Sequence, residues 1–289
     1  MLILNGRFVA SARFELLKSK IADFKSKQGL VPGLSVILVG EDPASEVYVR
    51  NKTKTSKDLG MNSTQINLPQ NISQEALEAK IEELGGDDQV HAILVQLPLP
   101  KHLSEERVLD KISPLKDVDG LQVENQGLLW AGRPRTISCT PNGVMKILEH
   151  YKIEAAGKRA VVVGRSQIVG KPMASLLLTA NATVSICHSK TKDLKSYTTE
   201  AEIVVVAAGL PRFLGKDSFA KGAVVIDVGI HRPTSGEFAG KLCGDVRFEE
   251  LEGWASAATP VPGGVGPMTI QMLMENTFFL AELASSSLT

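Results

Sequence analysis

Short apolar runs that alternate with helical patterns constrain the fold of this chain more than any other feature. Such runs occupy residues 34–39, 90–97, 159–163, 183–187, 203–206 and 223–228, and residues 62–68 are a weaker candidate. Runs that are apolar on both faces are typical of strands inside a parallel sheet. Amphipathic segments such as residues 14–24 separate them, so the pattern predicts an α/β fold in which helices cover parallel sheets.

The length of the chain predicts two domains. At about 150 residues per domain, 289 residues are enough for two cores. The alternation starts again near Thr140 and Pro141, a pair that can cap a helix and occupy its first turn. We expect one domain at residues 1–140 and a second at residues 141–267. The last helical segment, residues 268–289, is expected to pack back on the first domain.

Composition and charge exclude several classes of function. The 32 Lys and Arg residues balance the 32 Asp and Glu residues, which argues against a large basic surface for nucleic acid or membranes. The longest apolar run, residues 203–208, is far shorter than the ~20 residues that span a bilayer. Three widely spaced cysteines suit neither a disulfide framework nor a zinc site. We expect a cytoplasmic protein with no metal, nucleic-acid or membrane partner.

A strand, a glycine turn and a helix start follow one another at residues 160–172. Gly164 and Gly170 frame this turn, and glycines there let backbone N–H groups approach a pyrophosphate at a helix N-terminus. The spacing to Lys171 is one residue too long for a P-loop, and Ser166 replaces the second glycine of the full dinucleotide fingerprint. The pattern therefore predicts a variant dinucleotide site.

The end of the next predicted strand indicates which dinucleotide binds. An NAD site usually carries Asp or Glu about 20 residues beyond the turn, whereas residues 183–187 are followed by His188, Ser189 and Lys190. Arg165 and Ser189 suit a 2′-phosphate better than a pair of ribose hydroxyls. We predict NADP rather than NAD, although Arg165 taken by itself could be a solvated surface residue.

Polar residues of the first domain stand where its predicted strands and loops end. Tyr48 and Lys52 are one helical turn apart, so both side chains can point to one place. They precede Gly164, which argues against a short-chain dehydrogenase, where such a pair follows the dinucleotide turn. Gln96 ends an apolar run at the sheet edge where α/β proteins place ligands. Asp119 lies in an acidic turn that an ordinary surface loop could also explain.

Six short segments in one order along the chain carry the strongest functional signal. They are residues 39–52 with Tyr48 and Lys52, 95–100, 116–120, 139–141, 164–170 and 260–269. Together they resemble the bifunctional methylenetetrahydrofolate dehydrogenase/methenyltetrahydrofolate cyclohydrolase family. The resemblance implies an N-terminal catalytic domain with a parallel sheet, a Rossmann-like NADP-binding domain, and an active site in the cleft between them.

The resemblance implies two consecutive reactions on tetrahydrofolate derivatives. Hydride would leave the bridging methylene of 5,10-methylenetetrahydrofolate for NADP, and water would then attack the cationic methenyl carbon to give 10-formyltetrahydrofolate. Lys52 would be the central catalytic residue, with Tyr48 shaping the site, Gln96 orienting Lys52 and Asp119 binding the pterin. The family likeness also implies a homodimer.

The resemblance assigns binding residues in both domains. Substrate contacts would come from Tyr48, Lys52, Gln96, Asp119, Pro262, Gly263 and Gly264. Cofactor contacts would come from Gly164, Arg165, Ser166, Ile168, Gly170 and Ser189, and from the backbone of Ile230. Ser138 stands where the family usually has proline, which predicts a looser loop at the start of the second domain.

Two alternative functions stay open at this point. One is another two-domain NADP dehydrogenase with a catalytic lysine, of the shikimate dehydrogenase type, although residues 116–120 and 260–269 argue against it. The other is a non-catalytic folate or dinucleotide sensor on the same fold. Such a sensor would not need Lys52, Gln96 and Asp119 together, and turnover distinguishes it from an enzyme.

Overall fold

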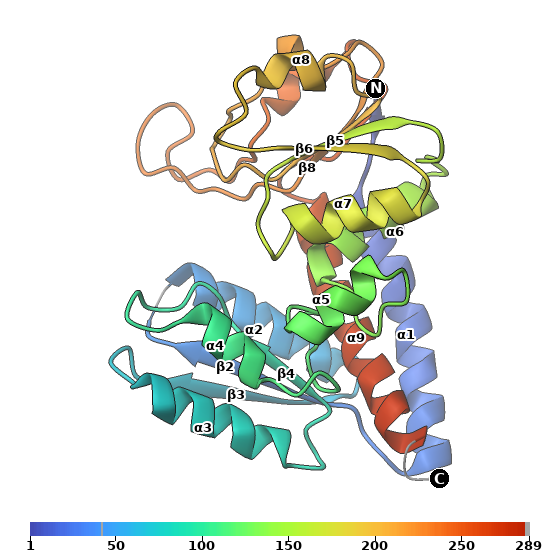
Figure 1. Ribbon diagram of the computed structural model, residues 1–289. Coiled ribbons are helices and arrows are strands. Elements are labelled where there is room, and N and C mark those ends of the chain that lie inside the picture. The colour runs from blue at the N-terminus through green and yellow to red at the C-terminus, as the bar shows by residue number, and fades with distance from the viewer. Residues whose placement is uncertain (42, 287–289) are drawn as a thin grey trace. The chain divides into compact units, whose positions relative to one another are not determined.

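The computed structural model describes residues 1–41 and 43–286, and of residues 43–48 the backbone alone. These residues form two compact units, each with a parallel sheet (Figure 1). Unit 1 consists of Met1–Ser11 and Ser138–Thr269, and unit 2 of Ala12–Ile137 and the described residues from Ile270 onward. The predicted α/β fold with parallel sheets is confirmed. Among the described helices, none is long and apolar enough to cross a membrane.

Unit 2 has a three-stranded parallel sheet in the order β3-β2-β4. Its strands are β2 (Gly33–Val39), β3 (Asn62–Leu68) and β4 (Ala92–Val95). Every residue of β2 and β4 is buried, as their apolar sequences predict, whereas β3 is a partly exposed edge strand. Figure 1 shows α2 (Pro43–Asp58) and α3 (Gln74–Gly85) on opposite faces of the sheet, because the two successive crossovers run in opposite directions.

The other helices of unit 2 are α4 (Glu105–Lys111), α5 (Val123–Trp130) and the larger parts of α1 (Gly6–Gln28) and α9 (Val265–Ser286). Helices α1 and α9 come from opposite ends of the chain. Phe24 of α1 and Phe278 of α9 pack edge to face, with ring centroids 5.6 Å apart. Arg13 and Glu275 form a further ion pair at 2.6 Å. These contacts join the C-terminal helix to the N-terminal part of unit 2.

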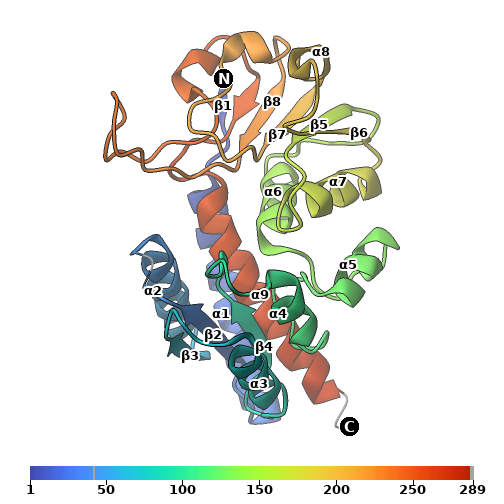
Figure 2. The ribbon, with the colours of Figure 1, turned by 60° about the vertical axis from the view of Figure 1, so that its left-hand side comes forward.

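Unit 1 has a six-stranded parallel sheet in the order β1-β9-β8-β7-β5-β6, and Figure 2 shows β1 and β6 at its two edges. The strands are β1 (Leu2–Ile3), β5 (Arg159–Val163), β6 (Thr183–Cys187), β7 (Ile203–Val206), β8 (Val224–Asp227) and β9 (Ala257–Ala258). The helices are α6 (Cys139–His150), α7 (Gly170–Thr179), α8 (Leu194–Thr198), η1 (Lys216–Ser218) and η2 (Phe248–Leu251). Since β5 pairs with both β6 and β7, the strand order reverses at β5. Parallel sheets of this type bind ligands at the carboxyl ends of the strands beside such a reversal.

The first eleven residues depart from the predicted domain bounds. The sequence analysis placed residues 1–140 together, whereas Met1–Ser11 belong to unit 1. The reason is β1, which pairs with β9 in register Leu2 with Ala257 and Ile3 with Ala258. A strand of two residues is too short for an alternating or apolar run to reveal it in the sequence.

Candidate active site

Lys52 and Gln96 meet at the carboxyl edge of the unit 2 sheet. Lys52 comes from α2 and is 8% exposed, and its Nζ donates a hydrogen bond to Gln96 Oε1 at 2.9 Å. Gln96 directly follows β4, and its backbone N–H donates to the Ile37 carbonyl of β2 at 2.9 Å. The Gln96 Nε2 donates to the Leu97 carbonyl at 2.7 Å, so the amide oxygen is directed toward the lysine. The structure therefore brings these two predicted residues together.

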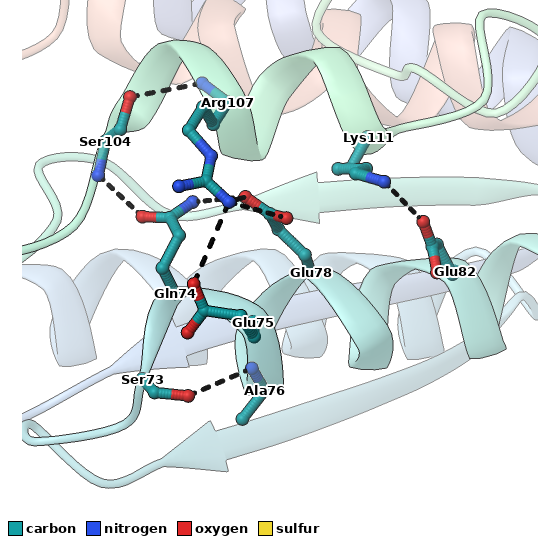
Figure 3. Close-up of polar contacts among 9 residues, drawn as sticks. All are labelled: Ser73, Gln74, Glu75, Ala76, Glu78, Glu82, Ser104, Arg107 and Lys111. Carbon is teal, nitrogen blue, oxygen red and sulfur yellow. Dashed lines mark hydrogen bonds and ion pairs between the residues drawn. The ribbon is translucent and has the colours of Figure 1, made fainter.

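The segment that follows Gln96 is fixed by a polar interface of α3 with α4, shown in Figure 3. The contacts are the ion pairs of Arg107 with Glu78 (2.9 Å) and of Lys111 with Glu82 (2.6 Å), and the hydrogen bond from the Ser104 amide to Gln74 (2.7 Å). Glu105 at the start of α4 also accepts a hydrogen bond from the Leu99 amide at 3.1 Å. The turn from β4 is thus tied to the start of α4, and α4 is in turn tied to α3.

The two aspartates of the segment 116–120 have different environments. Asp117 is buried, and its Oδ2 accepts hydrogen bonds from the Gln122 amide at 2.8 Å and Asn125 Nδ2 at 2.9 Å. Burial raises the pKa of Asp117, and these hydrogen bonds oppose that effect. Asp119 is half-buried in the same turn. Asp117 therefore builds the turn, and Asp119 is the carboxylate at which solvent or a ligand can arrive.

Asn276 of α9 holds the same turn from the other side. Its Nδ2 donates hydrogen bonds to the Val118 carbonyl at 2.8 Å and to the Ile137 carbonyl at 2.9 Å. Val118 stands between the two aspartates, so its peptide group is fixed next to Asp119. Tyr48 is the one predicted residue of this unit that the structure does not place, since its side chain lies outside the described residues.

The dinucleotide turn in unit 1 is built around close backbone contacts. A Cβ at Gly164, whose φ is +136°, would lie 2.3 Å from the Ala207 carbonyl oxygen. A Cβ at Gly170 would lie 2.3 Å from the Gly164 carbonyl oxygen. Ser166 Oγ accepts a hydrogen bond from the Val169 amide at 3.1 Å at the start of α7. Ser166 therefore replaces the second glycine of the fingerprint with a side chain that accepts a hydrogen bond within the turn.

Arg165 and Ser189 lie at the ends of neighbouring strands. Val163 of β5 is paired with Cys187 of β6, and the Gly164 amide donates to the Cys187 carbonyl at 2.8 Å. Both predicted residues are exposed at this carboxyl edge. The glycine turn and these two polar side chains fit the pyrophosphate and the 2′-phosphate of NADP.

Ser138 ties the beginning of α6 to the dinucleotide turn. Its side chain is buried and donates a hydrogen bond to the Ile168 carbonyl at 2.7 Å. A proline ring could not donate this hydrogen bond. The looser loop expected here stays a prediction. Ile168 itself is half-buried within the turn.

The glycine-rich segment before α9 packs against the N-terminus of the chain. The Gly263 carbonyl accepts a hydrogen bond from the Arg7 amide at 3.1 Å. A Cβ at Gly6 would lie 1.9 Å from the Gly264 carbonyl oxygen, and a Cβ at Gly264 would lie 2.6 Å from the Pro260 carbonyl oxygen. These contacts explain the glycines at residues 6 and 264 by packing. The predicted substrate contacts of Pro262, Gly263 and Gly264 stay predictions.

Sequence reasoning missed a pair of buried carboxylates in unit 1. Asp227 ends β8 and accepts hydrogen bonds from three backbone amides: Gly229 (2.9 Å), Asp245 (3.0 Å) and Val246 (2.9 Å). Asp245 is fully buried beside it and accepts a hydrogen bond from His231 Nε2 at 2.6 Å. A signal for Asp227 was present, since it ends an apolar run at the carboxyl edge of a sheet, as Gln96 does.

We predict that Asp227 makes the stability of the fold fall as pH rises. Burial, with a smaller contribution from Asp245, raises the pKa of Asp227 from 3.8 to about 6 despite its three N–H donors. The folded state then holds the proton more tightly than the unfolded state, so this contribution is present below about pH 4 and is lost as pH rises through about 6. Two pKa units correspond to about 3 kcal/mol.

The measurement is urea denaturation of the native protein and the Asp227→Asn variant from about pH 4 to pH 7. The variant loses a hydrogen bond at every pH, which gives a constant difference. On top of that difference, the variant should gain stability relative to the native protein as pH rises. A difference that does not vary with pH would show that Asp227 does not titrate in this range.

Two family models match the chain over most of its length. Residues 4–119 match the tetrahydrofolate dehydrogenase/cyclohydrolase catalytic domain. Residues 138–285 match the tetrahydrofolate dehydrogenase/cyclohydrolase NAD(P)-binding domain. Lys52, Gln96 and Asp119 lie in the first match, and the dinucleotide turn lies in the second.

Comparison with individual proteins points to the same family. The bifunctional protein FolD of Bdellovibrio bacteriovorus is 56% identical over 282 residues, which are 98% of this chain and 97% of that protein. The crystal structure of the bifunctional FolD enzyme from Campylobacter jejuni has a TM-score of 0.94 and 48% identity over 98% of this chain and 99% of that chain. FolD from Trypanosoma brucei, complexed with NADP cofactor and an inhibitor, has a TM-score of 0.93 and 39% identity over 98% of each chain.

A more distant likeness bears on the alternative enzyme. Shikimate 5-dehydrogenase from Thermus thermophilus has a TM-score of 0.51 and 17% identity over 89% of this chain and 98% of that chain. A likeness at that level of identity shows a similar fold alone. The two family models and the FolD relatives match this chain in sequence as well. The chain belongs to the tetrahydrofolate dehydrogenase/cyclohydrolase family.

Proposed function

We propose that the chain oxidises 5,10-methylenetetrahydrofolate with NADP and then hydrolyses the 5,10-methenyl product to 10-formyltetrahydrofolate. The observation that carries the proposal is the Lys52–Gln96 hydrogen bond of 2.9 Å in the unit that matches the catalytic domain. NADP, when bound, accepts the hydride in the first step. The turn at Gly164 and Gly170, which has no space for side chains, supports its binding. The location of the reaction in a cleft between the domains stays a prediction.

Lys52 is the proposed proton-transfer residue. After hydride has left, the methenyl carbon carries positive charge, and attack by water requires a group that removes a proton from that water. A neutral lysine amine can donate one hydrogen bond to Gln96 and still use its lone pair to accept this proton. Gln96 suits the role because it is an uncharged partner, whereas a carboxylate there would favour the ammonium form of the lysine.

Asp119 is the proposed pterin-binding residue. A pterin edge presents neighbouring N–H donors, and one carboxylate can accept two of them in a strong bidentate arrangement. The surrounding turn is fixed by Asp117 from one side and by Asn276 from the other. A carboxylate on a fixed turn loses little conformational freedom when the substrate binds, which favours affinity.

Arg165 supports the choice of NADP and gives a test of it. We predict that Arg165→Ala raises the KM for NADP by about tenfold, the effect of one charge-assisted hydrogen bond, and changes the KM for NAD little. Initial rates of methenyl formation with each dinucleotide measure both constants. Lys171→Ala is the control, since Lys171 is an exposed cation in the first turn of α7. An unchanged preference in Arg165→Ala would place the 2′-phosphate elsewhere.

The alternatives are tested with the same protein. Incubation with shikimate and NADP should give no dinucleotide reduction, whereas 5,10-methylenetetrahydrofolate and NADP should give methenyl product. Turnover at substrate excess excludes a non-catalytic sensor. We also propose a homodimer in the cytoplasm, on the family likeness alone, and the molecular mass in solution tests the dimer.

A further inference from the structure

Asp245 joins two loops at the carboxyl edge of the unit 1 sheet. Its carboxylate is 0% exposed and accepts hydrogen bonds from three successive amides after β7: Ala208 (2.6 Å), Gly209 (3.1 Å) and Leu210 (2.9 Å). The fourth donor is His231 Nε2 at 2.6 Å, from the loop after β8. Because a carboxylate can only accept here, Nε2 must carry the hydrogen. His231 therefore supplies the last of four hydrogen bonds to Asp245, after the three amides of residues 208–210.

Both loops follow adjacent strands of this sheet. Val206 of β7 is paired with Asp227 of β8, so residues 207–210 and 228–231 leave the same edge side by side. Little space separates them, since a Cβ at Gly229 would lie 2.5 Å from Asp245 Oδ1. The two loops are thus packed around the Asp245 carboxylate, and His231 provides the side-chain link across it.

Ile230 lies between two fixed residues of the second loop. The Gly229 amide donates to Asp227 at 2.9 Å, and the His231 amide and carbonyl are both paired with Cys243, at 2.8 and 3.0 Å. Among the described residues, the Ile230 N–H and C=O have no hydrogen-bond partner, and Ile230 is 41% exposed. A backbone N–H and C=O held in place without partners match the donor and acceptor of a carboxamide.

We propose that His231 is a positioning residue for NADP binding. Through Asp245 it holds the loop 228–231 against the loop 207–210 and so fixes the Ile230 peptide groups for the nicotinamide carboxamide. This inference rests on the proposed function for the identity of the ligand. We assign His231 a role in holding the loop and no direct contact with the cofactor. Loss of its side chain should therefore weaken binding of the dinucleotide and leave the folate chemistry intact.

Two substitutions separate the hydrogen bond from the volume of the ring. His231→Phe keeps an aromatic ring and removes the donor, whereas His231→Gln supplies an amide N–H at a reach similar to that of Nε2. Arg232→Ala is the control on the adjacent residue, because Arg232 donates to the Gly240 carbonyl further along the loop. Thermal unfolding of all the variants establishes that each is folded.

The primary measurement is calorimetric titration of NADP into the protein without folate. His231→Phe should raise the Kd for NADP by about tenfold, because binding must then order a loop that this hydrogen bond already holds in the native protein. His231→Gln should recover most of the affinity, and Arg232→Ala should match the native protein. Without any ligand, the amides of residues 208–210 should exchange hydrogen faster in His231→Phe. Hydrolysis of methenyl substrate, assayed without dinucleotide, should keep its native kcat and KM.

Two results would overturn the proposal. An unchanged Kd for NADP in His231→Phe would show that the loop is positioned without His231. An equal loss of NADP binding and methenyl hydrolysis that His231→Gln does not rescue would show a general structural role. Failure of the proposed function is distinguishable, because NADP binding by the native protein and by the variants is measured without folate. The predicted change in NADP affinity can therefore be tested even if the native protein does not turn over folate.

Discussion

Lys52→Met is expected to lower the rate of methenyl hydrolysis by about a thousandfold, within the usual contribution of a general acid–base group. Methionine has a similar length and no proton to exchange, so the variant removes the chemistry and keeps most of the volume. The dehydrogenase step transfers a hydride and needs no proton acceptor at the reacting carbon. It should therefore fall much less, and the ratio of the two activities is the informative quantity.

Lys54→Met is the matched control for this experiment. Lys54 lies on the same helix, is exposed, and should tolerate the same substitution without loss of either activity. Both steps are followed by the appearance and decay of the methenyl compound, first with NADP and then with methenyl substrate supplied directly. If Lys52→Met kept both activities, or lost both to the same extent, Lys52 would not be the group that exchanges a proton with water.

Gly164→Ala is expected to remove NADP binding and to destabilise the protein by about 3 kcal/mol, through a strained backbone and an overlap in a packed interior. The added methyl group would lie 2.3 Å from the Ala207 carbonyl oxygen, and the φ of +136° is unfavourable for alanine. Either the turn or the end of β7 has to move. Both changes displace the backbone amides that we propose receive the pyrophosphate.

Gly157→Ala separates strain from overlap. Gly157 also has a positive φ, +74°, but a Cβ there meets open space. It should cost about 1 kcal/mol and leave NADP affinity unchanged. Chemical denaturation and calorimetric titration of both variants test the comparison. Equal destabilisation and equal affinity in the two variants would show that the turn accepts a side chain at residue 164.

The sequence predicted those features that have strong local signals. Apolar runs such as residues 203–206 identify buried strands because a strand covered on both faces needs apolar residues throughout. The glycine turn was identified because backbone segments that pass close to one another leave no space for side chains. Gly164 and Gly170 make such close contacts with neighbouring backbone. The contact of Lys52 with Gln96 was expected from the family resemblance, and the structure brings the two residues together.

Features that depend on distant pairing were missed. β1 has two residues and gains its stability from β9, more than 250 positions further along the chain, so no local pattern marks it. Asp245 is in a loop. It links two other loops by accepting hydrogen bonds from backbone amides and a histidine, and only the folded chain brings these donors around it. The environment that distinguishes Asp117 from Asp119 is likewise set by Asn125 and Asn276, which no spacing rule connects to the turn.

The central claim is that one chain catalyses two consecutive steps with NADP as the oxidant. The most direct measurement supplies purified protein with 5,10-methylenetetrahydrofolate and either NADP or NAD, and follows methenyl formation and its hydrolysis in the same reaction. We predict that methenyl compound forms faster with NADP than with NAD and is then converted to 10-formyltetrahydrofolate faster than in buffer. Absence of dinucleotide reduction, or a methenyl product that decays only at the rate of the buffer reaction, would contradict the account.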